Sequence, residues 1–121
     1  MLDHVSLNVS DIDASRAFYE QALEPLGVGV IMEYPGFAGM GEDQKPWLWI
    51  AQRGEPCTSV HVALAVPDRA TVNAFYEAAI AAGGTDNGAP GLRPQYHPGY
   101  YGAFVLDPDG NNIEAVCHQP E

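Results

Sequence analysis

The chain contains an internal repeat. Residues 4–23 align without a gap on residues 61–80, at a constant offset of 57, and ten of the twenty aligned pairs are identical. Similarity at a fixed period predicts that one supersecondary unit is used twice. Because the chain has 121 residues, it has room for a single domain built from two such units.

Each repeat begins with a strand pattern followed by a helix pattern. Val5, Leu7 and Val9 alternate with polar residues, and the second repeat has the same alternation, which is typical of a strand with one buried face. Ser10 or Asp11 in the first repeat and Asp68 in the second are then suitable N-caps for helices. Apolar residues at helical spacing follow, and glycines end both patterns.

Further short strands are expected after each helix. We predict them at 28–34, 37–40 and 47–52, and at 101–106 and 111–117 after a less regular stretch through Leu92. The sequence Asp107-Pro108-Asp109-Gly110 predicts a tight connection between the last two strands. The fold is therefore α+β, with two βαβββ modules at about 2–52 and 59–118 and a connector at 53–59.

The composition excludes several kinds of partner. Sixteen acidic residues against five Lys and Arg give a net charge of −11, which disfavours nucleic acid and anionic membrane surfaces. No apolar run is long enough for a membrane span, and the first residues do not resemble a signal peptide, so we expect a cytoplasmic protein. Cys57 and Cys117 match no metal motif and are expected to be free thiols.

Three residues form a candidate metal site. His4 and His61 occupy equivalent places in the repeat, so a pseudo-twofold axis that relates the repeats also relates these two imidazoles. Glu114 on the last strand can point the same way, on a face that we expect to be open to solvent or ligand. Two histidines and one carboxylate with open positions are typical of catalytic zinc and of non-haem iron.

The same residues resemble a known family. Asp3-His4-Val5, Ser59-Val60-His61-Val62 and the stretch from Phe104 to Glu114 are similar to motifs of the vicinal oxygen chelate superfamily. That superfamily includes glyoxalase I, extradiol dioxygenases, fosfomycin-resistance transferases and bleomycin-resistance proteins. The resemblance implies a cupped eight-stranded mixed sheet with helices on its outer face. It also implies a divalent metal (Zn, Fe, Mn or Ni) on His4, His61 and Glu114, and a homodimer.

Other residues are candidates for the substrate side of the site. His97 is a candidate base or extra ligand, although it can equally be an ordinary loop histidine. Five aromatic residues either pack or line the cup, namely Trp47, Trp49, Tyr96, Tyr100 and Tyr101. We select Trp49 and Tyr101 as substrate-binding residues. Because cations are few, Arg93 and, less strongly, Arg53 are candidate anchors for a substrate carboxylate.

These features favour a metal-dependent enzyme whose small-molecule substrate chelates the ion through two neighbouring oxygens. Glyoxalase-like lyase or isomerase chemistry is favoured, with extradiol ring cleavage next. The alternative is a bleomycin-resistance type protein that binds an aromatic ligand without turnover. Thiol transfer of the fosfomycin type is less favoured, because no arginine follows Glu114.

Overall fold

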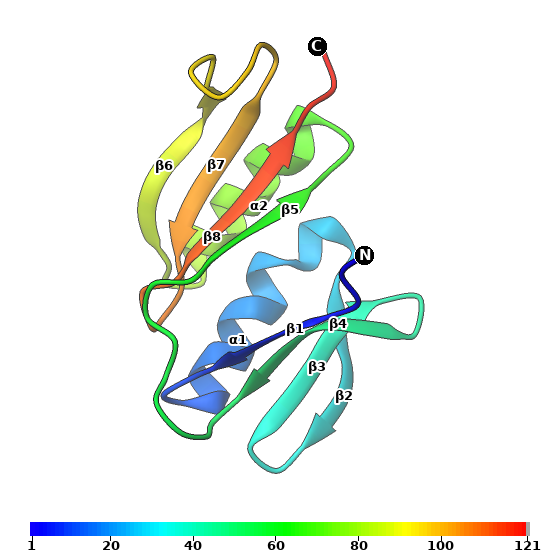
Figure 1. The fold of residues 1–121 in the computed structure, drawn as a ribbon, viewed down its shortest axis with the longest axis vertical. Helices are drawn as coiled ribbons and strands as arrows, with labels where there is room; N and C mark the ends of the chain where they lie inside the picture. The colour runs from blue at the N-terminus through cyan, green and yellow to red at the C-terminus, as the bar shows by residue number, and fades with distance from the viewer. Residues whose placement is uncertain (121) are drawn as a thin grey trace.

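The computed structural model describes residues 1–120 and contains two similar halves (Figure 1). The first half comprises β1 (Val5–Asn8), α1 (Ile12–Ala22), the short 3-10 helix η1 (Glu24–Leu26), β2 (Gly29–Tyr34), β3 (Phe37–Glu42) and β4 (Lys45–Ala51). The second half comprises β5 (His61–Ala65), α2 (Arg69–Ala81), β6 (Thr85–Leu92), β7 (Tyr101–Leu106) and β8 (Asn112–Cys117). The prediction of an α+β fold with two βαβββ modules is confirmed.

The eight strands are divided between two four-stranded mixed sheets. The strand orders are β1-β4-β3-β2 and β5-β8-β7-β6, so β1 and β5 are edge strands in equivalent positions. β1 pairs parallel with β4, β5 pairs parallel with β8, and the remaining pairs are antiparallel. Within a single chain, the eight strands therefore form two separate four-stranded sheets rather than one continuous eight-stranded sheet.

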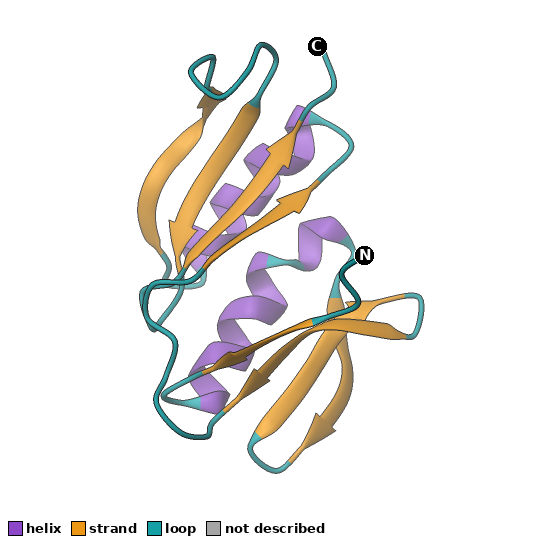
Figure 2. Cartoon of the chain, in the orientation of Figure 1, coloured by secondary structure: helices purple, strands orange, loops and turns teal. Residues whose placement is uncertain are grey.

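The helices cover one face of each sheet because the strand alternation places the apolar residues there. Figure 2 shows α2 crossing behind β7 and β8, which it contacts, while α1 lies between the two sheets and contacts α2. Leu7, Ile50, Phe18 and Phe75 are fully buried in the resulting core. Ile80, which the helical spacing places on the packed face of α2, is instead exposed near the end of that helix.

Polar contacts near the turn between β7 and β8 join the two halves. Asp107 accepts hydrogen bonds from the backbone N–H groups of Asp109 and Asn111, and Gly110 takes a positive φ of 92°, as the turn requires. The buried Tyr19 hydroxyl on α1 donates to the Asp107 carboxylate. Ser10 donates to Asp109 over 2.5 Å. The turn therefore stabilises the contact between the halves as well as the last hairpin.

Both cysteines are free thiols, as predicted. No helix within residues 1–120 has the length and apolar character needed to cross a membrane.

Candidate functional site

A buried carboxylate lies on the face of the second sheet opposite α2, where Phe104 and Val116 are buried as well. Glu114 on β8 is only 1% exposed, although its face was expected to be open. Its Oε1 lies 2.8 Å from His61 Nε2, and the Tyr100 hydroxyl donates to its Oε2. The His61 ring is half exposed, so it reaches from the buried carboxylate to solvent. Two of the three candidate metal ligands are thus adjacent.

The strand register explains why His61 and Glu114 are adjacent. Ala63 on β5 pairs with Glu114, and Phe104 on β7 pairs with it from the other side. Because side chains alternate along a strand, His61, Phe104 and Glu114 all project from the sheet face opposite α2. Gly102 lies on this face too, and a Cβ there would come within 3.2 Å of Glu114 Oε2 and of the Tyr100 ring. The missing side chain leaves the room that Tyr100 occupies.

Tyr100 was one of the five aromatic candidates in the sequence but was not selected as a site residue. Its ring makes edge contacts with Tyr96, His97 and His118. Desolvation, together with the hydrogen bond to Glu114, raises the pKa of Tyr100 above its ordinary value, so the phenol stays a donor at neutral pH. The one available signal was Gly102, a gap on the carboxylate face that a nearby large side chain has to fill.

The Tyr100 ring lies between His97 and the Glu114 carboxylate. Its Nε2 is 2.9 Å from His118 Nδ1, and its Nδ1 is 2.8 Å from the carbonyl oxygen of Pro98. The centroid of its ring is 5.2 Å from that of Tyr100. His97 therefore contacts the site through Tyr100, and its role as a base stays a prediction.

His4 lies on the other half of the molecule. It lines a pocket of about 500 Å³ on the open face of the first sheet, together with Trp49 and Arg53. Its Nδ1 is 2.7 Å from the Asp3 carboxylate, which also accepts hydrogen bonds from Lys45. Lys45 first, and then His4, hold the pKa of Asp3 below its usual range. Within residues 1–120, no group of three or more His, Cys, Asp or Glu side chains is placed to share one metal ion.

The candidate substrate-binding residues separate into two groups. Trp49 lies beside His4, and the guanidinium of Arg93 lies 5.3 Å from the centroid of the Phe104 ring, so both are on open sheet faces. Tyr101 is not. Its hydroxyl donates to Asn73 Oδ1 on α2 over 2.7 Å, because strand alternation turns it to the helix side. Tyr101 therefore lies on the helix side of the sheet, apart from the other candidate substrate-binding residues.

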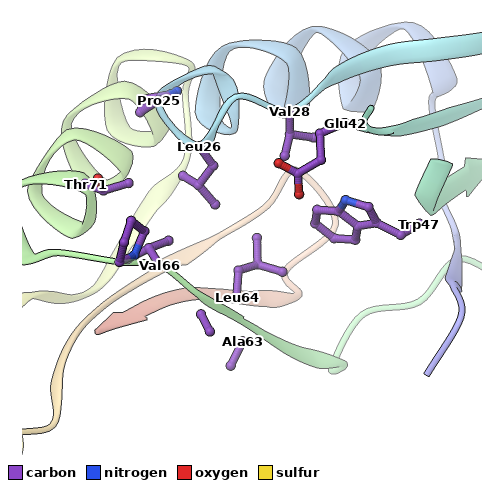
Figure 3. Close-up of a pocket in the computed structure, with 11 residues that line it drawn as sticks. Pro25, Leu26, Val28, Glu42, Trp47, Ala63, Leu64, Val66 and Thr71 are labelled. Atoms are coloured by element: carbon purple, nitrogen blue, oxygen red, sulfur yellow. The ribbon is translucent and has the colours of Figure 1, made fainter. Parts of the chain in front are cut away.

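A second pocket lies between the two halves (Figure 3). It has a volume of about 430 Å³ and is lined mainly by apolar side chains, including Leu26, Trp47, Leu64 and Val66. Figure 3 shows the Glu42 carboxylate near Trp47 at this pocket. None of the candidate ligands or substrate-binding residues lines it.

Comparisons with known proteins agree with this architecture. Residues 1–115 match the family model described as the Glyoxalase/Bleomycin resistance protein/Dioxygenase superfamily. The uncharacterized protein PA2024 of Pseudomonas aeruginosa is 34% identical, and the alignment covers 98% of this chain and 89% of that protein.

Two solved structures illustrate the shared fold. A glyoxalase/bleomycin resistance protein from Albidiferax ferrireducens is 30% identical, with a TM-score of 0.82 and 97% coverage of both chains. A lactoylglutathione lyase from Agrobacterium tumefaciens is 19% identical, with a TM-score of 0.68 and coverage of 94% of this chain and 90% of that one, so its likeness concerns the fold alone. The match of the family model over nearly the whole sequence shows that this chain belongs to the glyoxalase/bleomycin resistance protein/dioxygenase superfamily.

Proposed function

We propose that the protein is a metal-dependent enzyme that acts on a small molecule with two neighbouring oxygens. In this proposal His61 and Glu114 of one chain and His4 of a second copy hold a divalent ion. The observation that carries it is the buried Glu114 carboxylate, which lies 2.8 Å from an imidazole nitrogen on the sheet face opposite α2. A carboxylate is seldom buried unless it has a charged, metal or hydrogen-bonding partner.

The donor set fits a divalent transition metal only in part within one chain. Imidazole nitrogen and carboxylate oxygen suit Zn, Fe, Mn or Ni, and His61 and Glu114 supply one of each. The third donor, His4, belongs to the other sheet.

A second copy can supply this third donor. His4 and His61 are repeat equivalents, so when a first half pairs with the second half of another chain, a local pseudo-twofold axis relates one imidazole to the other. β1 and β5, which these histidines precede or begin, are edge strands with backbone groups available for such pairing. A homodimer with shared sites is therefore part of the proposal.

A divalent ion bound there would supply Lewis-acid stabilisation of negative charge on a chelated substrate oxygen. The protein's own residues position the groups around it. Tyr100 orients Glu114 through its hydroxyl. We retain His97 as the proposed proton acceptor, because imidazole is the general base most often used and this ring packs against Tyr100.

Glyoxalase-like lyase or isomerase chemistry is the favoured reaction, with extradiol ring cleavage next. The lactoylglutathione lyase from Agrobacterium tumefaciens has the same fold, which supports this preference by analogy. We also propose a cytoplasmic location, because both cysteines are free thiols, as in a reducing compartment.

Binding of an aromatic ligand without turnover is the second candidate function. It is favoured by three aromatic side chains on the open face of the first sheet. The ring centroids of Tyr34 and Phe37 are 4.7 Å apart, and those of Phe37 and Trp49 are 6.0 Å apart. Such a protein would not need the metal ligands.

Metal content separates the two functions. We expect protein purified without an affinity tag to contain about one divalent ion per chain by elemental analysis. Glu114→Gln keeps the shape of the side chain but removes its charge, so metal affinity should fall by at least about 10–100-fold. Glu77→Gln on the exposed side of α2 makes the same chemical change away from the site and should bind metal like the wild type. Unchanged metal binding by Glu114→Gln would refute the ligand assignment.

A further inference from the structure

Four of the five Lys and Arg side chains of this acidic protein fall into two groups, and the fifth, Arg69, lies over the Tyr101 ring. Arg16 forms ion pairs with Glu33 and Glu20, and Lys45 pairs with Asp3. Arg53 and Arg93, in contrast, have no carboxylate partner within residues 1–120. The chain has 16 acidic residues and only five Lys and Arg, so most basic side chains are expected to have an acidic neighbour. Arg53 and Arg93 depart from this expectation.

Arg53 lines the same pocket as His4. It follows β4, and within residues 1–120 its side chain makes one long hydrogen bond, in which Nε donates to Asn8 Oδ1 over 3.5 Å. The two terminal nitrogens of the guanidinium remain available. A guanidinium binds a carboxylate through two parallel hydrogen bonds, so Arg53 is a suitable anchor for an anionic group.

The wall of this pocket is aromatic. Phe37 and Trp49 line it, and Tyr34 continues the row, with Phe37 40% and Tyr34 48% exposed. A Cβ added at Gly39 would lie 2.7 Å from the Trp49 ring, so the indole covers the glycine and lies along the sheet surface. Exposed, closely spaced rings offer a surface on which a further ring can pack.

Trp49 occupies the position in the first repeat that is equivalent to Glu114 in the second. Ser6 pairs with Trp49 in the first sheet, and Ala63 pairs with Glu114 in the second. Ser6 and Ala63 are 57 positions apart and therefore equivalent. The first half thus carries an indole at the place where the second half carries its carboxylate, so it contributes an aromatic surface there.

We propose that the pocket of His4, Phe37, Trp49 and Arg53 binds an aromatic carboxylate. The aromatic ring packs on Trp49 and Phe37, and the carboxylate accepts hydrogen bonds from Arg53. A volume of about 500 Å³ is sufficient for such a molecule. As a substrate class this assignment rests on the proposed function, but the binding step uses residues of one sheet and needs no metal.

The test uses benzoate and its neutral near-isostere benzamide with metal-free, full-length protein. The chain has two tryptophans, so its nitrogen-15 NMR spectrum contains two indole N–H signals. Trp47 lines the other pocket, which makes its signal an internal control. We expect benzoate to shift the Trp49 signal selectively. Benzamide should bind with an affinity at least about tenfold lower, because a hydrogen bond between charged partners contributes about that much more to binding than one to a neutral partner.

Two variants complete the test. Arg53→Gln should abolish the preference for benzoate over benzamide, whereas Arg16→Gln, which removes the same charge from α1, should leave it unchanged. Equal binding of benzoate and benzamide, a response of Trp47 alone, or no response of Trp49 would overturn the proposal. If benzoate fails while the wild type holds its metal, only the substrate class is wrong. If benzoate binds and no metal is found, the enzyme proposal fails and the ligand-binding function replaces it.

Discussion

At the scale of single residues, the least common feature is a carboxylate whose two oxygens are both engaged by side chains from other elements. His61 contacts Glu114 Oε1 from β5, and Tyr100 donates to Oε2 from the loop before β7. The pKa of Tyr100 is raised by desolvation and by this hydrogen bond, so the phenol stays protonated over the whole neutral range. The orientation of Glu114 therefore depends on a neutral donor that does not titrate there.

Tyr100→Phe tests this dependence. The substitution keeps the ring that contacts Tyr96 and His118 and removes only the hydroxyl. We expect metal affinity to fall by about 10–100-fold, as typically follows the loss of a hydrogen bond to a ligand. Calorimetric titration of metal-free protein measures the effect, and Tyr96→Phe is the matched control. Equal affinities for the two variants would show that Tyr100 does not support Glu114.

The sequence predicted the placement of residues on strands better than that of residues on loops. His61 and Glu114 project from one sheet face, as the pattern predicts, because alternation along β5 and β8 is regular. Alternation also explains why Tyr101 lies apart from Glu114, since residues 102 and 104 share the carboxylate face and 101 does not. Tyr100 reaches Glu114 through the path of a loop, and no periodic pattern specifies such a path.

At the scale of elements, the N-cap of α2 links helix stability to pH. Asp68 accepts hydrogen bonds from the Thr71 hydroxyl and backbone N–H, at 2.6 and 2.8 Å, and these bonds lower the pKa of Asp68 below its usual value of 3.8. The carboxylate is therefore favoured in the folded state. Its contribution to stability is fully present above the unfolded-state pKa and is lost as pH falls through the lower folded-state pKa.

Asp68→Asn is expected to remove this pH dependence, because asparagine also caps helices but does not titrate. The wild type should have the higher thermal midpoint at about pH 7, and the difference should shrink below about pH 4. Thr71→Val removes the larger of the two causes and should give an intermediate difference. Thermal unfolding followed by circular dichroism is the measurement. A difference that is constant with pH would contradict the role of the Asp68 charge.

The contact between α1 and the β7–β8 turn is a buried polar link between the halves. Tyr19→Phe leaves one buried oxygen of Asp107 without the phenol donor, so we expect a loss of about 1–3 kcal/mol in the free energy of unfolding. Tyr76→Phe changes the repeat-equivalent residue, which is only partly buried, and should cost less. Urea unfolding of both variants decides this, and equal costs would show that the Asp107 contact does not stabilise the fold.

Element positions followed the repeat closely except at β6. The alternation predicted β1 and β5 and the helix signals predicted α1 and α2, because both patterns come from one buried face per element. β6 (Thr85–Leu92) was described only as less regular, and its pairing with β7 has register shifts on both sides of Gly88. Bulges interrupt the period of two on which strand recognition depends.

At the scale of the whole molecule, each chain carries the candidate ligands on the faces of two sheets that the helices do not cover. The helices occupy the opposite faces and contact each other, so the faces of His4 and of Glu114 belong to separate sheets of one chain. The sequence relates His4 to His61 by symmetry but does not specify whether the related modules belong to one chain or two. The resemblance therefore predicted a homodimer, but sequence reasoning left open whether each site lies within one chain or across two.

Mixing two defective variants determines which chains form the site. His4→Ala and Glu114→Gln each disable every site in their own homodimers. In a mixed dimer with shared sites, one site combines both defects, while the other takes His4 from one chain and the intact His61 and Glu114 from the other.

After the two variants are unfolded and refolded together in equal amounts, half of the dimers are mixed, so metal content should rise to about one quarter of the wild-type value per chain. Each variant refolded alone should bind none. If His4, His61 and Glu114 met within one chain, mixing would restore nothing, because every chain would still lack a ligand. If sedimentation at micromolar protein showed a single 13 kDa species, the shared site would be excluded directly.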